Sequence, residues 1–159
     1  MAIFDTERLT DRVKEIIQAN ISAKLTEINN EYSDTIILDA IPTSAYYLNS
    51  MDPDANENPF LVYGIDNVAI STAGPAAASR YSIFVIVGHG GMRNEYDENV
   101  QRKLMRYARA IKEIMKENFD QLGGYSNLEI EEYPSRPALQ TKRGEILKVS
   151  GLVFTATIS

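Results

Sequence analysis

The chain has 159 residues, the size of one ordinary domain that buries most of its apolar surface without disulfides. It contains no cysteine, which excludes a disulfide framework, a thiolate nucleophile and a cysteine metal site. The net charge of −6 argues against binding nucleic acid over the whole surface, because phosphate binding needs concentrated lysine and arginine; an acidic protein can still surround DNA without holding it. No apolar run approaches the ~20 residues that span a bilayer, and the N-terminus does not resemble a signal peptide, so we expect no membrane partner and folding in the cytoplasm.

The first predicted element is a long amphipathic helix over about residues 7–30. Asp5 or Thr6 can cap its start. Apolar residues then recur at steps of three or four or their sums: Leu9, Val13, Ile16, Ile17, Ile21, Leu25 and Ile28. Charged residues that predict a wet face lie between them: Asp11, Arg12, Lys14, Glu15, Lys24 and Glu27. We expect the apolar stripe to face the core, with a partner helix as the alternative.

An irregular region follows Tyr32. Residues 35–41 could form a short strand, which Pro42 would end. The segment at about 42–59 holds three prolines and many turn residues, which predicts a long loop. Such a loop is usually functional or mobile, and it is the first place to expect a contact with a neighbouring subunit. A surface excursion without function is the alternative.

Several strands are predicted next. Phe60–Tyr63 and Val68–Thr72 read as two strands joined near Gly64–Asn67. The segment Arg80–Val87 is apolar on both faces, which predicts a central strand with both sides covered. A glycine turn at Gly88–Gly91 would then lead into the second helix.

The second helix is predicted over about residues 94–118. Its apolar stripe comprises Val100, Leu104, Tyr107, Ala108, Ile111, Ile114 and Met115. A basic stripe runs beside it and comprises Arg102, Arg106, Arg109, Lys112 and Lys116. Acidic residues at the start of the helix suit its dipole, but five cations exceed what the dipole needs. The stripe could be a solvated face, could bind an acidic neighbouring subunit, or, least favoured, could bind nucleic acid. Acidic candidates for a subunit contact lie in the long loop: Asp52, Asp54 and Glu57.

The C-terminal part predicts two strands joined by a basic loop. Leu128 and Ile130 alternate with glutamates, as in a strand with one wet face, and residues 144–159 read as a final strand. The loop at about 134–144 contains two prolines, which deny it regular pairing. Its cations are Arg136, Lys142 and Arg143. They are suited to reaching an acidic partner, with a solvated turn as the alternative.

No residue set predicts catalysis. His89 is the only histidine, so neither a zinc site of nitrogen and sulfur ligands nor a set of several imidazoles can form. The turn at Gly88–Gly91 lacks the spacing of a P-loop or a dinucleotide fold. Glu131 and Glu132 are adjacent in a predicted strand and would point to opposite faces, which suits no shared acid–base site. We therefore expect no enzyme activity, no metal and no cofactor.

The order of elements resembles a tail terminator (tail completion) protein of tailed bacteriophages. The resemblance rests on the long N-terminal helix, the proline-rich loop, the strand Arg80–Val87, the helical run Glu98–Lys112 and the final strand from Gly144. It implies a structural virion protein that forms a homohexameric ring at the head-proximal end of the tail and terminates growth of the tail tube.

The implied partners are the tail tube protein, a head-side connector or neck protein, and a sheath protein if the tail is contractile. DNA would pass through the lumen without specific binding. Another neck or head–tail connector protein is the alternative, and a small nucleotide-binding protein using the Gly88–Gly91 turn is a further one.

The predicted fold is a single α+β domain over residues 1–159. We expect a mostly antiparallel or mixed sheet of four to six strands flanked by the two long helices. Their apolar stripes need a common apolar surface, which the strand Arg80–Val87 can supply.

Overall fold

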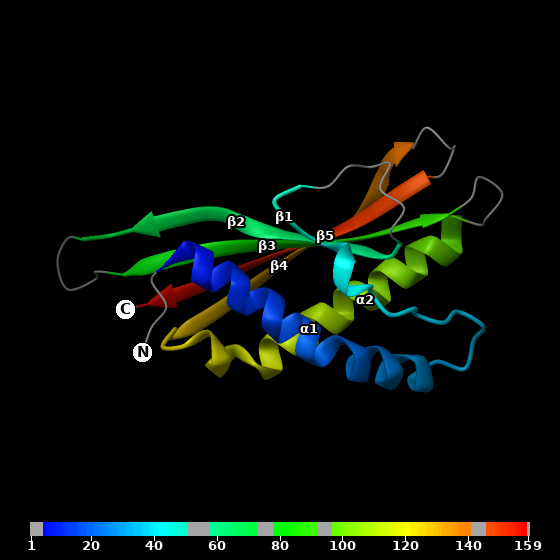
Figure 1. The fold of residues 1–159 in the computed structure, drawn as a ribbon, viewed down its shortest axis with the longest axis horizontal. Coiled ribbons are helices and arrows are strands. Elements are labelled where there is room, and N and C mark those ends of the chain that lie inside the picture. Colours follow the sequence, from blue (N-terminus) through cyan, green and yellow to red (C-terminus); the bar gives the residue numbers. More distant parts are fainter. Residues whose placement is uncertain (1–4, 51–57, 73–77, 92–96, 141–145, 159) are drawn as a thin grey trace.

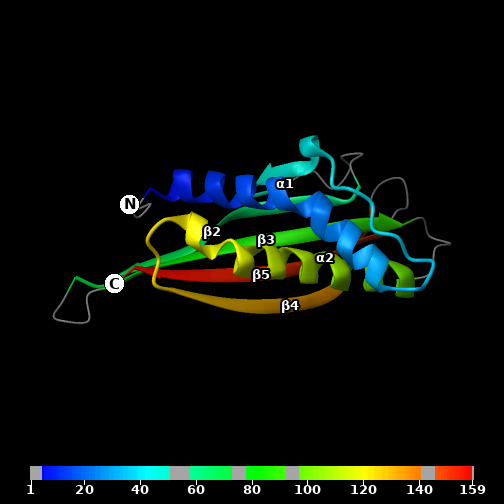
Figure 2. The same cartoon turned by 90° about the horizontal axis from the view of Figure 1, so that it is seen from below.

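The computed structural model describes residues 5–50, 58–72, 78–91, 97–140 and 146–158. Two long helices lie together on one face of a twisted sheet, as Figures 1 and 2 show from perpendicular directions. The helices are α1 (Thr6–Glu31) and α2 (Asp97–Glu117), and a short 3-10 helix, η3 (Phe119–Leu122), follows α2. This arrangement confirms the predicted α+β fold in a single domain.

The sheet has five strands in the order β1-β2-β3-β5-β4. These are β1 (Tyr46–Leu48), β2 (Phe60–Ile70), β3 (Ser79–Gly91), β4 (Asn127–Gln140) and β5 (Ile146–Ile158). The short β1 pairs with β2 in parallel, and every other pair is antiparallel, so the sheet is mixed.

The core lies between the sheet and the two helices. The apolar stripe of α1 is buried as predicted, from Leu9 to Ile28, and the stripe of α2 is buried from Val100 to Met115. On the sheet, Ile83 and Val85 of β3 and Phe154 of β5 face these helices and are fully buried. Asp5 caps α1 by accepting a hydrogen bond from the backbone N–H of Glu7 at 2.9 Å.

Two predictions between the helices were wrong. Residues 35–41 form no strand, and the short strand of this region is β1, inside the segment predicted to be a loop. The strands predicted at Phe60–Tyr63 and Val68–Thr72 are one strand, β2, which keeps its pairing to β3 through a register shift between Ile65 and Asn67. A β-bulge absorbs the polar residues that had indicated a turn.

The predicted glycine turn is also a strand. Residues 88–91 continue β3 and pair with β5 from Val149 to Ile146. Gly88 lies beside Phe60, and a Cβ atom at position 88 would come within 2.0 Å of that ring. Gly90 is held by Asn58, whose side-chain amide donates to the Gly90 carbonyl at 2.9 Å and accepts from its N–H at 2.8 Å. These glycines serve close packing within the sheet.

The predicted basic loop is shorter than expected. β4 extends to Gln140, so the backbone of residues 134–140 is strand, with register shifts between Tyr133 and Arg136 and between Pro137 and Gln140. Proline is tolerated here because β4 is an edge strand with pairing on one side only.

The expectation that β3 has both sides covered was wrong for the described residues. Odd-numbered residues of β3 from Tyr81 to Val87 are buried under the helices, whereas Ser82, Phe84 and Ile86 on the other face are only partly buried.

Lys24, which we placed on the wet face of α1, is buried between the helices. Its ammonium lies 3.0 Å from a carboxylate oxygen of Glu117 and 3.6 Å from one of Glu113.

Candidate functional site

We call the face of the sheet opposite the helices the helix-free face. It carries a shallow apolar groove of about 420 Å³. The groove is lined by Phe84, Ile86, Tyr133, Val149, Gly151, Leu152 and Val153. Strand alternation places the side chains of Phe84, Ile86 and Val153 together, because Phe84 pairs with Val153 and Ile86 pairs with Gly151 across β3 and β5. The side chain of Leu152 points to the helix side and is fully buried.

Glycines give the groove its depth. Gly151 has no side chain, so the floor opens between Ile86 and Tyr133. Gly64 of β2 leaves room for the ring of Phe84, since a Cβ at position 64 would lie 2.8 Å from that ring.

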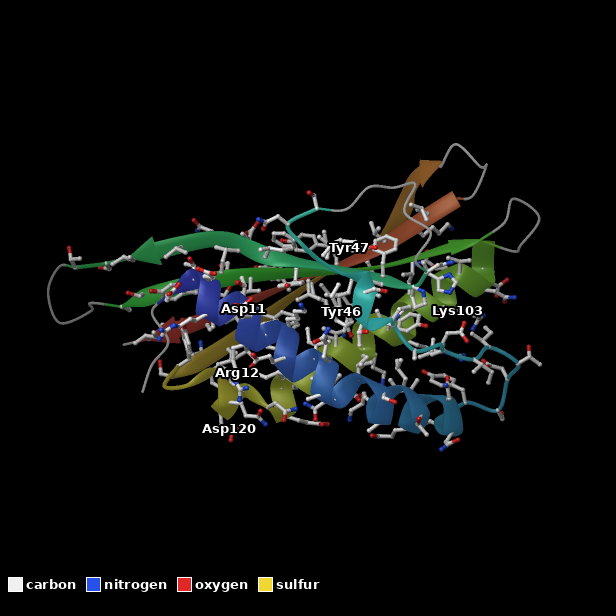
Figure 3. All side chains as sticks on the ribbon, viewed as in Figure 1. Asp11, Arg12, Tyr46, Tyr47, Lys103 and Asp120 are labelled. Atoms are coloured by element: carbon white, nitrogen blue, oxygen red, sulfur yellow. The ribbon has the colours of Figure 1, made fainter. Side chains whose placement is uncertain are left out.

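Adjacent strand residues alternate between the two faces, and the two tyrosines of β1 follow this rule. Figure 3 shows Tyr46 on the helix side of the sheet and Tyr47 on the helix-free side.

Acidic side chains border one part of the groove. Tyr133 is 54% exposed, and its hydroxyl donates to Glu131 at 2.7 Å. This hydrogen bond raises the pKa of Tyr133, and the charges of Glu131 and Asp66 raise it further. Glu129 lies two residues before Glu131 in β4 and forms an exposed ion pair with Arg80 at 3.1 Å. The border therefore carries three carboxylates and one guanidinium.

Hydroxyl groups lie between the groove and this ion pair. Ser82 and Thr155 face each other across β3 and β5 with their oxygens 3.0 Å apart. The helix-free face is thus apolar at its centre and polar towards the end of the sheet that carries Arg80 and Glu129.

The basic stripe of α2 is divided between buried and exposed positions. Arg106 is only 5% exposed. Its guanidinium donates to both carboxylate oxygens of Asp34 and to the Ile36 carbonyl, and lies 3.7 Å from the centre of the Tyr32 ring. The hydrogen bond from Arg106 holds the pKa of Asp34 below its usual range. Arg106 therefore fixes the chain that follows α1 onto α2.

Three further members of the stripe, Arg109, Arg102 and Lys112, bind carboxylates nearer the surface, and Lys116 is exposed. Arg109 donates to Glu31 at 2.7 Å and to Glu113 at 2.9 Å, and these hydrogen bonds lower the pKa of both carboxyl groups. Arg102 makes an exposed pair with Glu98, one turn earlier on α2, at 2.8 Å.

Lys112 and Glu132 join α2 to β4, with 2.6 Å between the ammonium and a carboxylate oxygen. Glu131 and Glu132 therefore point to opposite faces of the sheet, as predicted for adjacent residues of a strand.

Most of the predicted contact residues of the two loops lie outside the part of the chain that the structure describes. Asp52, Asp54 and Glu57 of the long loop lie outside the described residues, as do Lys142 and Arg143 of the basic loop. Arg136 is described only by its backbone, which pairs with Val149. A role of these residues in subunit contacts stays a prediction.

His89 is a packed residue of the sheet. It is 6% exposed, its Nδ1 lies 2.7 Å from the Gly90 carbonyl oxygen, and its ring stacks on Tyr107 at 6.3 Å between centroids. Among the described residues, no three histidine, aspartate or glutamate side chains gather in a group that could hold a metal ion.

Sequence reasoning missed the helix-free groove, although its signal was visible. Arg80–Val87 is apolar on both faces, which we interpreted as a central strand with both sides covered. The same pattern arises when one side of a strand is left for another molecule.

In comparisons with known proteins, no protein-family model matches the chain, and no curated protein matches its sequence.

None of the helices in the described residues is long and apolar enough to span a membrane.

Proposed function

We propose that this chain is a structural virion protein of a tailed bacteriophage. It forms a ring at the head-proximal end of the tail, ends growth of the tail tube and offers the surface to which the head-side connector binds. Its partners are other copies of itself, the tail tube protein and the connector, and DNA passes through the ring. It acts by binding and shape, without a catalytic step.

The observation that carries this proposal is the helix-free face. A five-stranded sheet whose helices cover one side leaves Phe84, Ile86 and Val153 around an open groove on the other. These side chains are only partly buried, and apolar surface that its own chain leaves uncovered is suited to contact with another molecule. A protein whose work is to be built into a larger particle needs such a surface. The resemblance in element order supplies the identity of the particle.

The backbone geometry at Gly88–Gly91 does not favour the competing function, nucleotide binding. Those residues are paired in β3 and do not form an anion-binding turn before a helix. A thermal-shift measurement with ATP and GTP tests this directly, and we expect no rise in the unfolding temperature. Another neck or connector protein of the virion remains the nearest alternative, because it would need the same kind of surface.

Electron microscopy of particles assembled without this protein tests the function. We expect tails of uncontrolled length that do not join to heads, because nothing would cap the tube. Tails of normal, uniform length attached to heads would contradict the proposal. Expression of the protein in trans is the control, and it should restore joined particles.

A connector protein would give a different defect from a terminator. Loss of a connector leaves tails of normal length that are separate from the heads, whereas loss of a terminator changes tail length. Measuring tail length and head attachment on the same grids therefore separates the two virion functions.

A further inference from the structure

We propose that the occupant of the helix-free face is a second copy of this chain, which docks the arginine-bearing outer face of its α2 there. Both surfaces belong to every subunit and lie on opposite sides of the sheet, so the contact is head-to-tail. This inference rests on the proposed ring, because head-to-tail contacts between identical subunits close into rings when the rotation fits.

The receiving surface combines an apolar centre with an acidic border. Phe84, Ile86 and Val153 line the centre, while Asp66 and Glu131 lie close to Tyr133 at the border. Carboxylates beside an apolar groove favour a partner that presents an apolar side chain flanked by cations.

The outer face of α2 has that composition. Met105 is 60% exposed, the second-highest exposure among the large apolar side chains described as exposed. Arg102 and Arg109 lie three residues before it and four residues after it, so all three share one side of the helix. Arginine and methionine are enriched in the cores of protein interfaces.

The present partner of Arg102 does not prevent the contact, while Arg109 keeps its pairs with Glu31 and Glu113. Arg102 and Glu98 are 54% and 72% exposed at their side chains, and such a surface ion pair contributes little. Arg102 can therefore turn from Glu98 to a carboxylate of a neighbouring subunit at small cost. Arg106 is buried against Asp34 and stays a structural residue.

Charge also argues against two copies meeting by their helix-free faces. Such a two-fold contact would bring Asp66, Glu129 and Glu131 of both copies to one interface. Among the described residues of the border, each copy would add one cation, Arg80. Like charges at an interface disfavour association. The docking of α2 onto the groove instead brings Arg102, whose exposed pair with Glu98 contributes little, against these carboxylates.

Site-specific crosslinking tests the contact cleanly, because the chain has no cysteine of its own. Met105→Cys and Val153→Cys variants of the full chain, one carrying an affinity tag, are mixed and treated with a short bismaleimide over a range of protein concentrations. The same reaction is run on assembled particles that contain both variants. Arg8→Cys replaces Met105→Cys in the control, since Arg8 is an exposed side chain at the start of α1.

We expect a crosslinked dimer that contains one subunit of each variant. Val153→Cys alone and the Arg8 control should give little product. Adding Arg102→Glu to the Met105→Cys chain should lower the yield about tenfold, because it sets a carboxylate against the acidic border. Circular dichroism checks that every variant is folded.

Other outcomes overturn the inference. Dimers formed by Val153→Cys alone would show the two-fold contact instead. Ring-sized oligomers, or particles, without the mixed crosslink would show that the subunits use another surface, while the proposed function would stand. A mixed crosslink together with normal tails in particles that lack the protein would keep the contact and reject the function.

Discussion

Gly88 is a residue whose lack of a side chain decides local packing. The ring of Phe60 occupies the space where a Cβ atom would lie, at 2.0 Å. Gly88→Ala should therefore destabilise the fold by about 1–3 kcal/mol, the usual range for overpacking a core. Urea unfolding followed by circular dichroism measures this change.

Gly151 offers the matched control in the same sheet. A Cβ there would meet Tyr133 at 3.7 Å and Ile86 at 3.9 Å, which is ordinary contact. Gly151→Ala should leave the free energy of unfolding within about 1 kcal/mol of wild type or raise it slightly. Equal losses for both substitutions would contradict the role assigned to Phe60. Phe60→Leu should partly restore Gly88→Ala, since it removes the crowded ring atoms.

Two buried tyrosines differ in whether their hydroxyls have partners. Tyr107 donates to the Asp39 carbonyl at 2.6 Å, whereas the hydroxyl of Tyr46 finds no partner among the described residues. Burial raises the pKa of Tyr46 to about 12. Tyr107→Phe should cost about 1 kcal/mol of stability, and Tyr46→Phe should be neutral or stabilising by about that amount. Thermal or urea unfolding of the two variants decides, and losses in both would show that Tyr46 has a partner.

At the scale of elements, both helices could be predicted to within about three residues at each end. Their apolar residues recur at helical spacing, and Asp5 supplies a cap, so α1 begins at Thr6 where residue 7 was predicted and ends at Glu31 where residue 30 was predicted. α2 was predicted at about 94–118 and spans Asp97–Glu117. Local spacing carries this information without tertiary context.

Strand boundaries could not be predicted as well, because pairing partners decide them. Gly64 and Asn67 indicated a turn, yet β3 pairs with β2 on both sides of the bulge. Gly88 and Gly90 indicated a turn as well, but Phe60 and Asn58 fill the space beside them. The candidate site depends on the same long-range information, since strands far apart in sequence contribute Phe84, Tyr133 and Val153.

The connection after α1 should make the stability of the fold sensitive to acid. The hydrogen bond from Arg106 holds the pKa of Asp34 below its usual value, which is about 3.9 in an unfolded chain. The folded state therefore binds this proton less readily than the unfolded state. The stabilising contribution is present above the unfolded pKa and is lost as pH falls through the lower folded pKa.

Asp34→Asn tests this account. We expect the variant to be less stable than wild type near neutral pH and to lose less stability on acidification below about pH 4, because one of the titrating contacts is gone. Glu31→Gln should act in the same direction, since Arg109 lowers the pKa of Glu31. Urea midpoints measured from neutral pH downward provide the data. An unchanged acid slope in Asp34→Asn would show that the Arg106 contact does not form in solution.

For the whole molecule, the sheet order predicts where the fold opens most readily. β3 is hydrogen-bonded to a neighbour on each side along its length, and β5 lies between β3 and β4. β1 pairs at three residues only, and β4 lies at the opposite edge with two register shifts. α2 packs on β3 and β5, where Ile83, Val85 and Phe154 are fully buried.

Amide hydrogen exchange should follow this order. We expect Ile83, Val85 and Phe154 to exchange at the rate of global unfolding, because no smaller opening exposes them. Tyr47 and Leu48 of β1 should exchange much faster, and the β4 residues after Tyr133 should be intermediate. Mass spectrometry of peptides from each strand, with the chain kept at concentrations where it is monomeric, measures these rates. Equal protection of β1 and β3 would mean that β1 is fixed by contacts beyond its three register pairs, and that the sheet opens only as one unit.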